Sequence, residues 1–113
     1  MAQLALNVFK TKTLEVTTSE QTVYTAPVGY TSIILYSHVS NVGSSSATFT
    51  ISHYRSSSST QTEIIKDGTV PINDAYIPLQ GKLVLETGDI VKIQGSADNT
   101  LKLILSILET ANS

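Results

Sequence analysis

The sequence predicts an all-β protein, a single-domain antiparallel sandwich or barrel of about eight strands. Short apolar and β-branched runs recur about every 8–12 residues with turn-forming residues between them, which is typical of such folds. No stretch carries a sustained helical period, and no internal repeat is found. The 113 residues fit one domain with a single core.

The first part of the chain is expected to divide at residue 13. Residues 1–13 are predicted to form an N-terminal arm or an edge strand, since apolar residues alternate along 4–9, and residues 14–113 form the sandwich domain. Residues 22–26 are rich in β-formers and end before Pro27, so we predict a strand there rather than a helix beginning at Ser19. A turn follows over residues 27–30.

Two strands are expected in the middle of the chain. Residues 31–42 predict a long one, and residues 47–52 show the cleanest apolar and polar alternation, which indicates a half-buried strand. The long strand is expected to place these residues on its two faces: Ile33, Leu35 and Val39 on one, and Ile34, Tyr36 and His38 on the other. The serine-rich residues 55–60 predict a polar loop.

The last part of the chain holds the clearest turn signals. Residues 62–66 predict a strand that ends in a turn at Asp67-Gly68, and residues 75–79 a short strand. Residues 81–95 predict a hairpin whose turn contains Gly88, which can take a positive φ, and Asp89, which can bond its own backbone.

Residues 100–109 predict the closing strand. Its apolar residues occupy both sides, with Leu101, Leu103, Leu105 and Ile107 on one and Ile104 and Leu108 on the other. We therefore expect this strand to be central or covered on both faces.

Composition excludes several classes of function. Charged residues make up only 14% of the chain, against a usual value of about 25%, and the net charge is −2. Without a basic block, nucleic-acid binding is not expected. The absence of cysteine removes disulfides, zinc thiolates and cysteine nucleophiles. Neither a secretory signal nor a membrane span is predicted, so we expect synthesis in a cytoplasm.

Between Gln21 and Tyr54 the sequence contains no Asp, Glu, Lys or Arg. Exposed strands usually carry charges that prevent edge pairing, and interface cores are depleted of charge and enriched in tyrosine. We therefore predict a surface covered by another subunit; the alternative is that Ser and Thr solvate the face of a monomer. The candidate interface residues are Leu4, Leu6, Val8, Tyr24, Tyr30, Tyr36, His38, Thr48 and Thr50.

No motif supports catalysis or cofactor binding. His38 or His53 could be combined with serine and aspartate into a triad, but the G-x-S-x-G turn that would expose the nucleophile is missing. Neither metal-binding histidine spacing nor a nucleotide-binding glycine loop occurs. The sequence therefore predicts a protein that is not an enzyme and has no cofactor or metal. Glycan binding stays open, because the five tyrosines could stack on sugars.

Four segments, YTAPVGYTSIIL, SNVGSSSATFTISHY, GKLVLETGDIVKIQG and LKLILSILET, occur in this order. Together they resemble small virion structural proteins of tailed bacteriophages, especially those of cyanobacteria and other marine bacteria, over residues 23–110. The resemblance implies a jelly-roll-like sandwich without catalytic residues. It also implies a capsid decoration (cement) protein on the capsid surface, or an accessory part of the neck, tail or fibre base.

The resemblance also implies partners. These are other copies of the chain, with a trimer favoured, and the phage major capsid protein or another virion protein, without nucleic acid or membrane. A decoration protein that bridges capsid subunits to stabilise the head is the first hypothesis, a neck, tail or fibre-base part is the second, and a glycan-binding adhesion module is the third.

Overall fold

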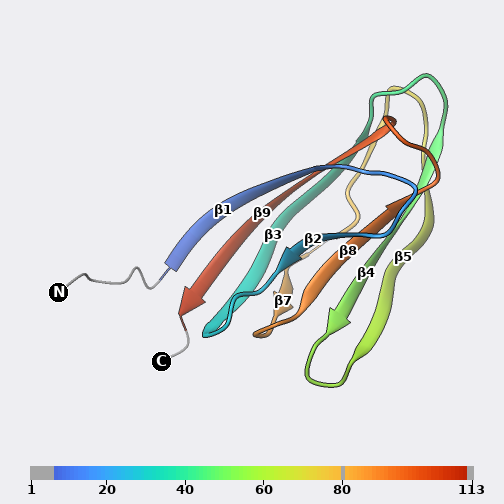
Figure 1. Cartoon of the computed structure of the whole chain (residues 1–113). Helices are drawn as coiled ribbons and strands as arrows, with labels where there is room; N and C mark the ends of the chain where they lie inside the picture. The colour runs from blue at the N-terminus through green and yellow to red at the C-terminus, as the bar shows by residue number, and fades with distance from the viewer. Residues whose placement is uncertain (1–6, 80, 112–113) are drawn as a thin grey trace.

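Nine strands in two antiparallel sheets form a sandwich in the computed structural model, which describes residues 7–79 and 81–111 (Figure 1). No helix occurs within these ranges. The strands are β1 (Asn7–Glu15), β2 (Gln21–Thr25), β3 (Tyr30–Asn41), β4 (Ala47–Arg55), β5 (Thr60–Val70), β6 (Ala75–Tyr76), β7 (Leu83–Leu85), β8 (Ile90–Gly95) and β9 (Leu101–Ala111).

The strand order is that of a jelly roll. Sheet A has the order β1-β9-β3, and the short strands β6 and β7 both pair with the far edge of β3. Sheet B has the order β2-β8-β4-β5. The chain passes from one sheet to the other at each connection except β4 to β5 and β6 to β7, which produces two interlocked Greek keys. The predicted all-β, jelly-roll-like sandwich is therefore confirmed.

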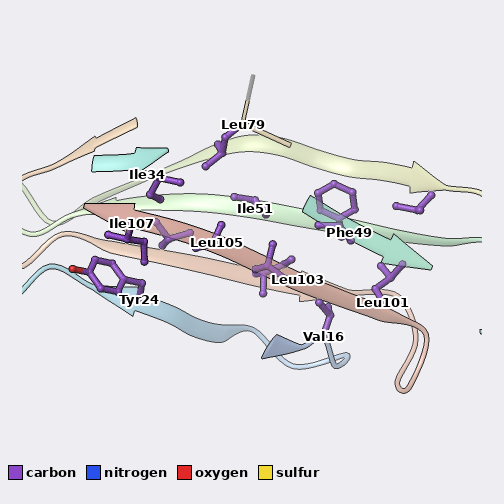
Figure 2. Close-up of a cluster of buried hydrophobic side chains, with 14 of the residues drawn as sticks. Val16, Tyr24, Ile34, Phe49, Ile51, Leu79, Leu101, Leu103, Leu105 and Ile107 are labelled. Atoms are coloured by element: carbon purple, nitrogen blue, oxygen red, sulfur yellow. The ribbon is translucent and has the colours of Figure 1, made fainter. Parts of the chain in front are cut away.

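The core lies between the inner faces of the two sheets (Figure 2). Phe49 and Ile51 of sheet B meet the inward residues of β9, which lies in the middle of sheet A between β1 and β3. These inward residues are Leu101, Leu103, Leu105 and Ile107, all buried as the alternation predicted. The central position expected for this strand is confirmed.

A bulge in β3 changes which residues face the core. The register of β3 on β9 shifts between Ile34 and Tyr36, so Leu35 is an extra residue and the alternation inverts after it. Ile34 and Val39 are consequently both buried, although the sequence pattern placed them on opposite faces. That facial assignment was wrong, because simple alternation contains no signal for an inserted residue.

The hairpin predicted over residues 81–95 is also wrong in its pairing. β7 pairs with β3 in sheet A, whereas β8 pairs with β2 and β4 in sheet B. The turn itself forms: the Gly88 φ is +84°, and the Asp89 carboxylate accepts a hydrogen bond from the Glu86 amide at 3.1 Å. Turn chemistry determines that the chain reverses but not which strands the two arms join.

The expected turn at Asp67-Gly68 lies inside β5 instead. Lys66 and Asp67 together stand opposite Thr50, so the ladder to β4 bulges, and Asp67 takes a φ of +54°. The Asp67 amide donates to the Thr50 hydroxyl at 3.1 Å, which keeps the bulge bonded to its neighbour. The pair Asp67-Gly68, which is typical of turns, therefore forms a bulge that bends the edge strand β5.

Replacing Gly88 tests the turn between the two sheets. A Cβ at Gly88 would lie 3.1 Å from the Ser56 Oγ, whereas Gly29 has the same φ of +84° and nothing within 4 Å. We expect Gly88→Val to lower the free energy of unfolding by about 2 kcal/mol, and the matched Gly29→Val by about 1 kcal/mol. Urea denaturation followed by circular dichroism measures both; equal losses would show that Ser56 does not crowd the position.

Candidate interaction face

The outer face of sheet A carries a continuous row of apolar side chains, here called the apolar row. Phe9 of β1 pairs with Leu108 of β9, Leu108 with Ile33 of β3, and Ile33 with Val84 of β7. The two ends protrude, because the exposed fraction is 73% for Phe9 and 54% for Val84. Four neighbouring strands therefore present apolar residues to the outside at one level of the sheet.

The neighbouring rows of this face are uncharged as well. One row contains Thr11, Ser106 and Tyr36, and the next contains Thr13, Ile104 and His38. The Tyr36 and His38 rings are stacked, with centroids 6.2 Å apart and planes inclined by 12°. From the Ile104 row to the Thr110 row, none of the outward-facing residues that pair across β1, β9 and β3 is charged.

Among the paired residues of this outer face, charge appears at the far end. There Glu15 of β1 pairs with Lys102 of β9, which places one carboxylate and one ammonium on adjacent strands. A shallow depression of about 370 Å³ lies at this end, with His38 and Ser40 of β3 on its other side. The two opposite charges leave this end without net charge.

The outer face of sheet B differs in chemistry. Lys92 lies 3.9 Å from Glu20 and 4.9 Å above the Tyr54 ring, and Gln61 donates to Glu20 at 3.1 Å. Glu63 adds a further carboxylate on β5. These groups bind one another, as expected of a polar surface.

Two of the edge strands, β1 of sheet A and β5 of sheet B, have features that hinder pairing with another strand. On β1, Lys10 and Lys12 point to the inner side, since they pair with the buried residues Ile107 and Leu105 of β9. On β5, the bulge at Asp67 interrupts the ladder. Inward-pointing charges and bulges are recognised protections of edge strands.

A buried polar cluster joins the two sheets beneath the apolar row. The Glu109 side chain is almost fully buried; it accepts a hydrogen bond from the Tyr24 hydroxyl and lies 3.2 Å from the Lys10 Nζ. The Tyr24 hydroxyl also lies 2.8 Å from the Ser32 Oγ. Burial, followed by the hydrogen bond to Glu109, raises the pKa of Tyr24 well above its usual range. The cluster fastens β1, β2, β3 and β9 together.

This raised pKa predicts a loss of stability at alkaline pH. Because the pKa of Tyr24 is higher in the folded than in the unfolded chain, its contribution is complete below the unfolded value of about 10 and is lost as the pH rises above it. We expect the free energy of unfolding of the wild type to fall more steeply above about pH 10 than that of Tyr24→Phe. Urea titrations across this range measure both; parallel profiles would contradict the assignment.

A second buried carboxylate, that of Asp89, stabilises two loops. Asp89 accepts hydrogen bonds from the backbone amides of Ser56 and Glu86, each at 3.1 Å, and lies 3.2 Å from the His53 Nε2. The group therefore holds the β4–β5 and β7–β8 loops together.

Two further observations limit the chemistry of the described part of the chain. Across residues 7–79 and 81–111, no three His, Asp or Glu side chains gather closely enough to bind a metal ion. Over the same residues there is no helix with the length and apolar character needed to span a membrane.

The candidate interface residues that the sequence predicted lie in different parts of the structure. Leu4 and Leu6 lie outside the described residues. Tyr24 is buried in the core, so it is not a surface residue. Val8 is half-buried opposite Glu109, on the inner side of β1.

The other candidates lie on both sides of the sandwich. Tyr36 and His38 are on the outer face of sheet A, whereas Thr48 and Thr50 are on the outer face of sheet B. Tyr30 begins β3, where its carbonyl accepts a hydrogen bond from the Thr87 hydroxyl at 2.9 Å. The uncharged stretch of sequence is thus divided between two opposite surfaces.

Sequence reasoning missed the apolar row. Its residues come from four strands, so only the strand register brings Phe9, Leu108 and Val84 to one level. The signal that could have found it was the second apolar side of β9, at Ile104 and Leu108, which indicated a strand with apolar residues on both faces.

Comparison with known proteins identifies relatives in fold only. No protein-family model and no curated protein sequence matches this chain. A chain from the capsid of Helicobacter pylori bacteriophage KHP30 has 10% identity and a TM-score of 0.57, and the match covers 96% of this chain and 90% of that one. A chain from Bacillus endospore appendages, described as disulfide-linked pili, has 11% identity and a TM-score of 0.56, with 100% and 98% covered.

A chain from the T13 particle of infectious bursal disease virus is similar over part of its length. It has 10% identity and a TM-score of 0.58; the match covers 96% of this chain but 32% of that one. The jelly-roll sandwich is therefore shared with chains from viral capsids and from a bacterial appendage.

Proposed function

We propose that this protein is a non-enzymatic structural component of a phage virion, specifically a capsid decoration protein that oligomerises and bridges capsid subunits. The observation that carries this proposal is the match over 96% of this chain and 90% of a phage capsid chain. The uncharged outer face of sheet A supports it, since interface cores are depleted of charge.

The mechanism is physical. A head that contains packaged DNA is under outward pressure, and a part that binds two or more neighbouring capsid subunits resists their separation. A symmetric oligomer, with a trimer favoured, engages several subunits at once, so modest contacts combine into strong binding. The protein would be made in the host cytoplasm and added to the capsid surface, with the major capsid protein as its partner.

A fibre subunit is the second candidate, because the endospore-appendage chain matches equally well in fold. That assembly is described as disulfide-linked, and the present sequence contains no cysteine. Disulfide linkage is therefore not available here. A neck, tail or fibre-base part of a virion stays as the alternative within the proposed class, and glycan adhesion is the least supported.

Binding to particles tests the proposal. Heads that lack the protein are mixed with purified labelled protein, sedimented, and imaged by electron microscopy, with a β-sandwich of similar size and charge as the control. We expect saturation at many copies per head, arranged with the symmetry of the shell. Binding at one vertex or on tails would assign the protein to the neck or tail, and no binding to particles would contradict a virion role.

A further inference from the structure

We infer that the outer face of sheet A is the surface through which copies of this chain contact one another. The inference rests on the proposed function and deepens it, because it names a surface through which two copies pair. Packing of this face on the same face of a second copy gives a two-fold dimer, whereas a trimer would need the face to meet a different surface. It rests on the chemistry of this face, on its size, and on the contrast with the rest of the molecule.

The chemistry of the face suits a second copy of itself. When a face packs on the same face of a second copy, a face with charges of one sign meets charges of that sign, which costs free energy unless opposite charges are also present. The apolar row and its two neighbouring rows contain no charged residue, and the pair at the far end of the face, Glu15 and Lys102, has both signs. The apolar and hydroxyl side chains of this face can therefore pack against those of a second copy without burying an unpaired charge.

The exposed ends of the apolar row provide the driving force. Phe9 and Val84 have exposed fractions of 73% and 54%, and they lie on the two outermost strands of this face. Between them, Leu108 and Ile33 complete the row, and Tyr36 lies one row further along. Aromatic and aliphatic residues surrounded by hydroxyl-bearing neighbours match the composition of a subunit contact.

The size of the face is close to that of a small specific contact. Three strands, β1, β9 and β3, at about 4.8 Å spacing and about nine residues at about 3.4 Å, with the three residues of β7 added, give a flat area of roughly 500 Å². Two such faces bury roughly 1,000 Å² before the relief of the side chains is added, which approaches the lower limit of about 1,200 Å² for stable interfaces.

The other surfaces are less suited to self-association. The outer face of sheet B has charged groups bound to one another, as between Lys92 and Glu20. Of the edge strands, β1 carries inward lysines and β5 carries a bulge. Edge-to-edge pairing through β1 or β5 is therefore disfavoured.

The oligomeric mass of the purified protein tests this inference without any particle. Sedimentation velocity is recorded for the wild type, for Phe9→Asp/Val84→Asp on the apolar row, and for Thr22→Asp/Thr25→Asp on the outer face of sheet B. All four positions are exposed, and both double variants add the same charge. We expect the wild type and the sheet B variant to form an oligomer. The apolar-row variant should associate at least about 10-fold more weakly than the wild type, with an unchanged circular dichroism spectrum.

Three results would overturn the inference. They are a monomeric wild type at micromolar concentrations, equal loss of association in both double variants, and association of the apolar-row variant as tight as that of the wild type. A variant lacking residues 1–6 adds a fourth such result: if this variant alone dissociates, the N-terminal segment makes the contact instead. Since particle binding is measured separately, a monomeric protein that still decorates heads would overturn the self-contact and leave the virion role standing.

Discussion

Replacing Leu85 with aspartate is expected to prevent folding, whereas the same change at its neighbour Val84 leaves the monomer folded. Leu85 is fully buried against the core, and Val84 has an exposed fraction of 54% on the opposite side of β7. Truncating a buried leucine costs about 2–5 kcal/mol, and an unpaired buried carboxylate adds several more. This loss is comparable with the whole stability of a small domain, about 5–15 kcal/mol.

Circular dichroism and thermal melting measure the two variants. We expect Leu85→Asp, and likewise Leu103→Asp on β9, to lack a cooperative transition, while Val84→Asp melts close to the wild type. Val84→Asp also removes part of the apolar row, so its defect should appear in oligomeric mass and not in the β-sheet spectrum. A soluble, β-rich Leu85→Asp protein with normal melting would refute the placement of β7 in the core.

Truncating Glu109 is expected to produce the second large effect. Its carboxylate binds the Tyr24 hydroxyl and lies 3.2 Å from the Lys10 Nζ, in a site closed to water. Glu109→Ala leaves the tyrosine hydroxyl without this acceptor and opens a cavity. The Lys10 side chain is half-exposed, so its charge can turn to solvent, and we discount the ion pair accordingly. The expected loss of unfolding free energy is about 2–4 kcal/mol.

Glu109→Gln is the matched control, because it keeps the size of the side chain and an acceptor for Tyr24 while removing the charge. We expect it to lose only about 1 kcal/mol, from the weaker hydrogen bond and the lost pairing with Lys10. Urea denaturation at neutral pH compares the two variants with the wild type. If glutamine costs as much as alanine, the charge and not the hydrogen bond to Tyr24 stabilises the junction.

The strands that alternate simply were predictable from the sequence. Inward residues of β9, such as Leu103 and Leu105, and of β4, such as Phe49, follow a period of two without interruption, so burial could be assigned to each. In β3 one extra residue at Leu35 inverted the pattern, and in β5 a pair that usually marks a turn formed a bulge. Bulges depend on the partner strand, which local sequence does not contain.

The sequence predicted that an interface would be uncharged, but it did not predict where in the fold that interface lies. A stretch without charge between Gln21 and Tyr54 indicated that some surface is covered. The jelly roll divides this stretch between two sheets, and Tyr36 and Thr50 lie on opposite faces as a result. The apolar row draws on Phe9 and Val84, which lie outside the stretch altogether.

The sequence by itself determined the all-β class, the presence of a single core and the absence of cysteine chemistry. These features depend on chain length, on composition and on the period of each strand. Only the tertiary structure decided that β7 and β8 belong to different sheets and that four strands align the apolar row. The physical reason is that alternation is a property of one strand, whereas register and sheet membership are properties of pairs. Pairing is selected by the whole core, over sequence distances as long as that from Phe9 to Leu108.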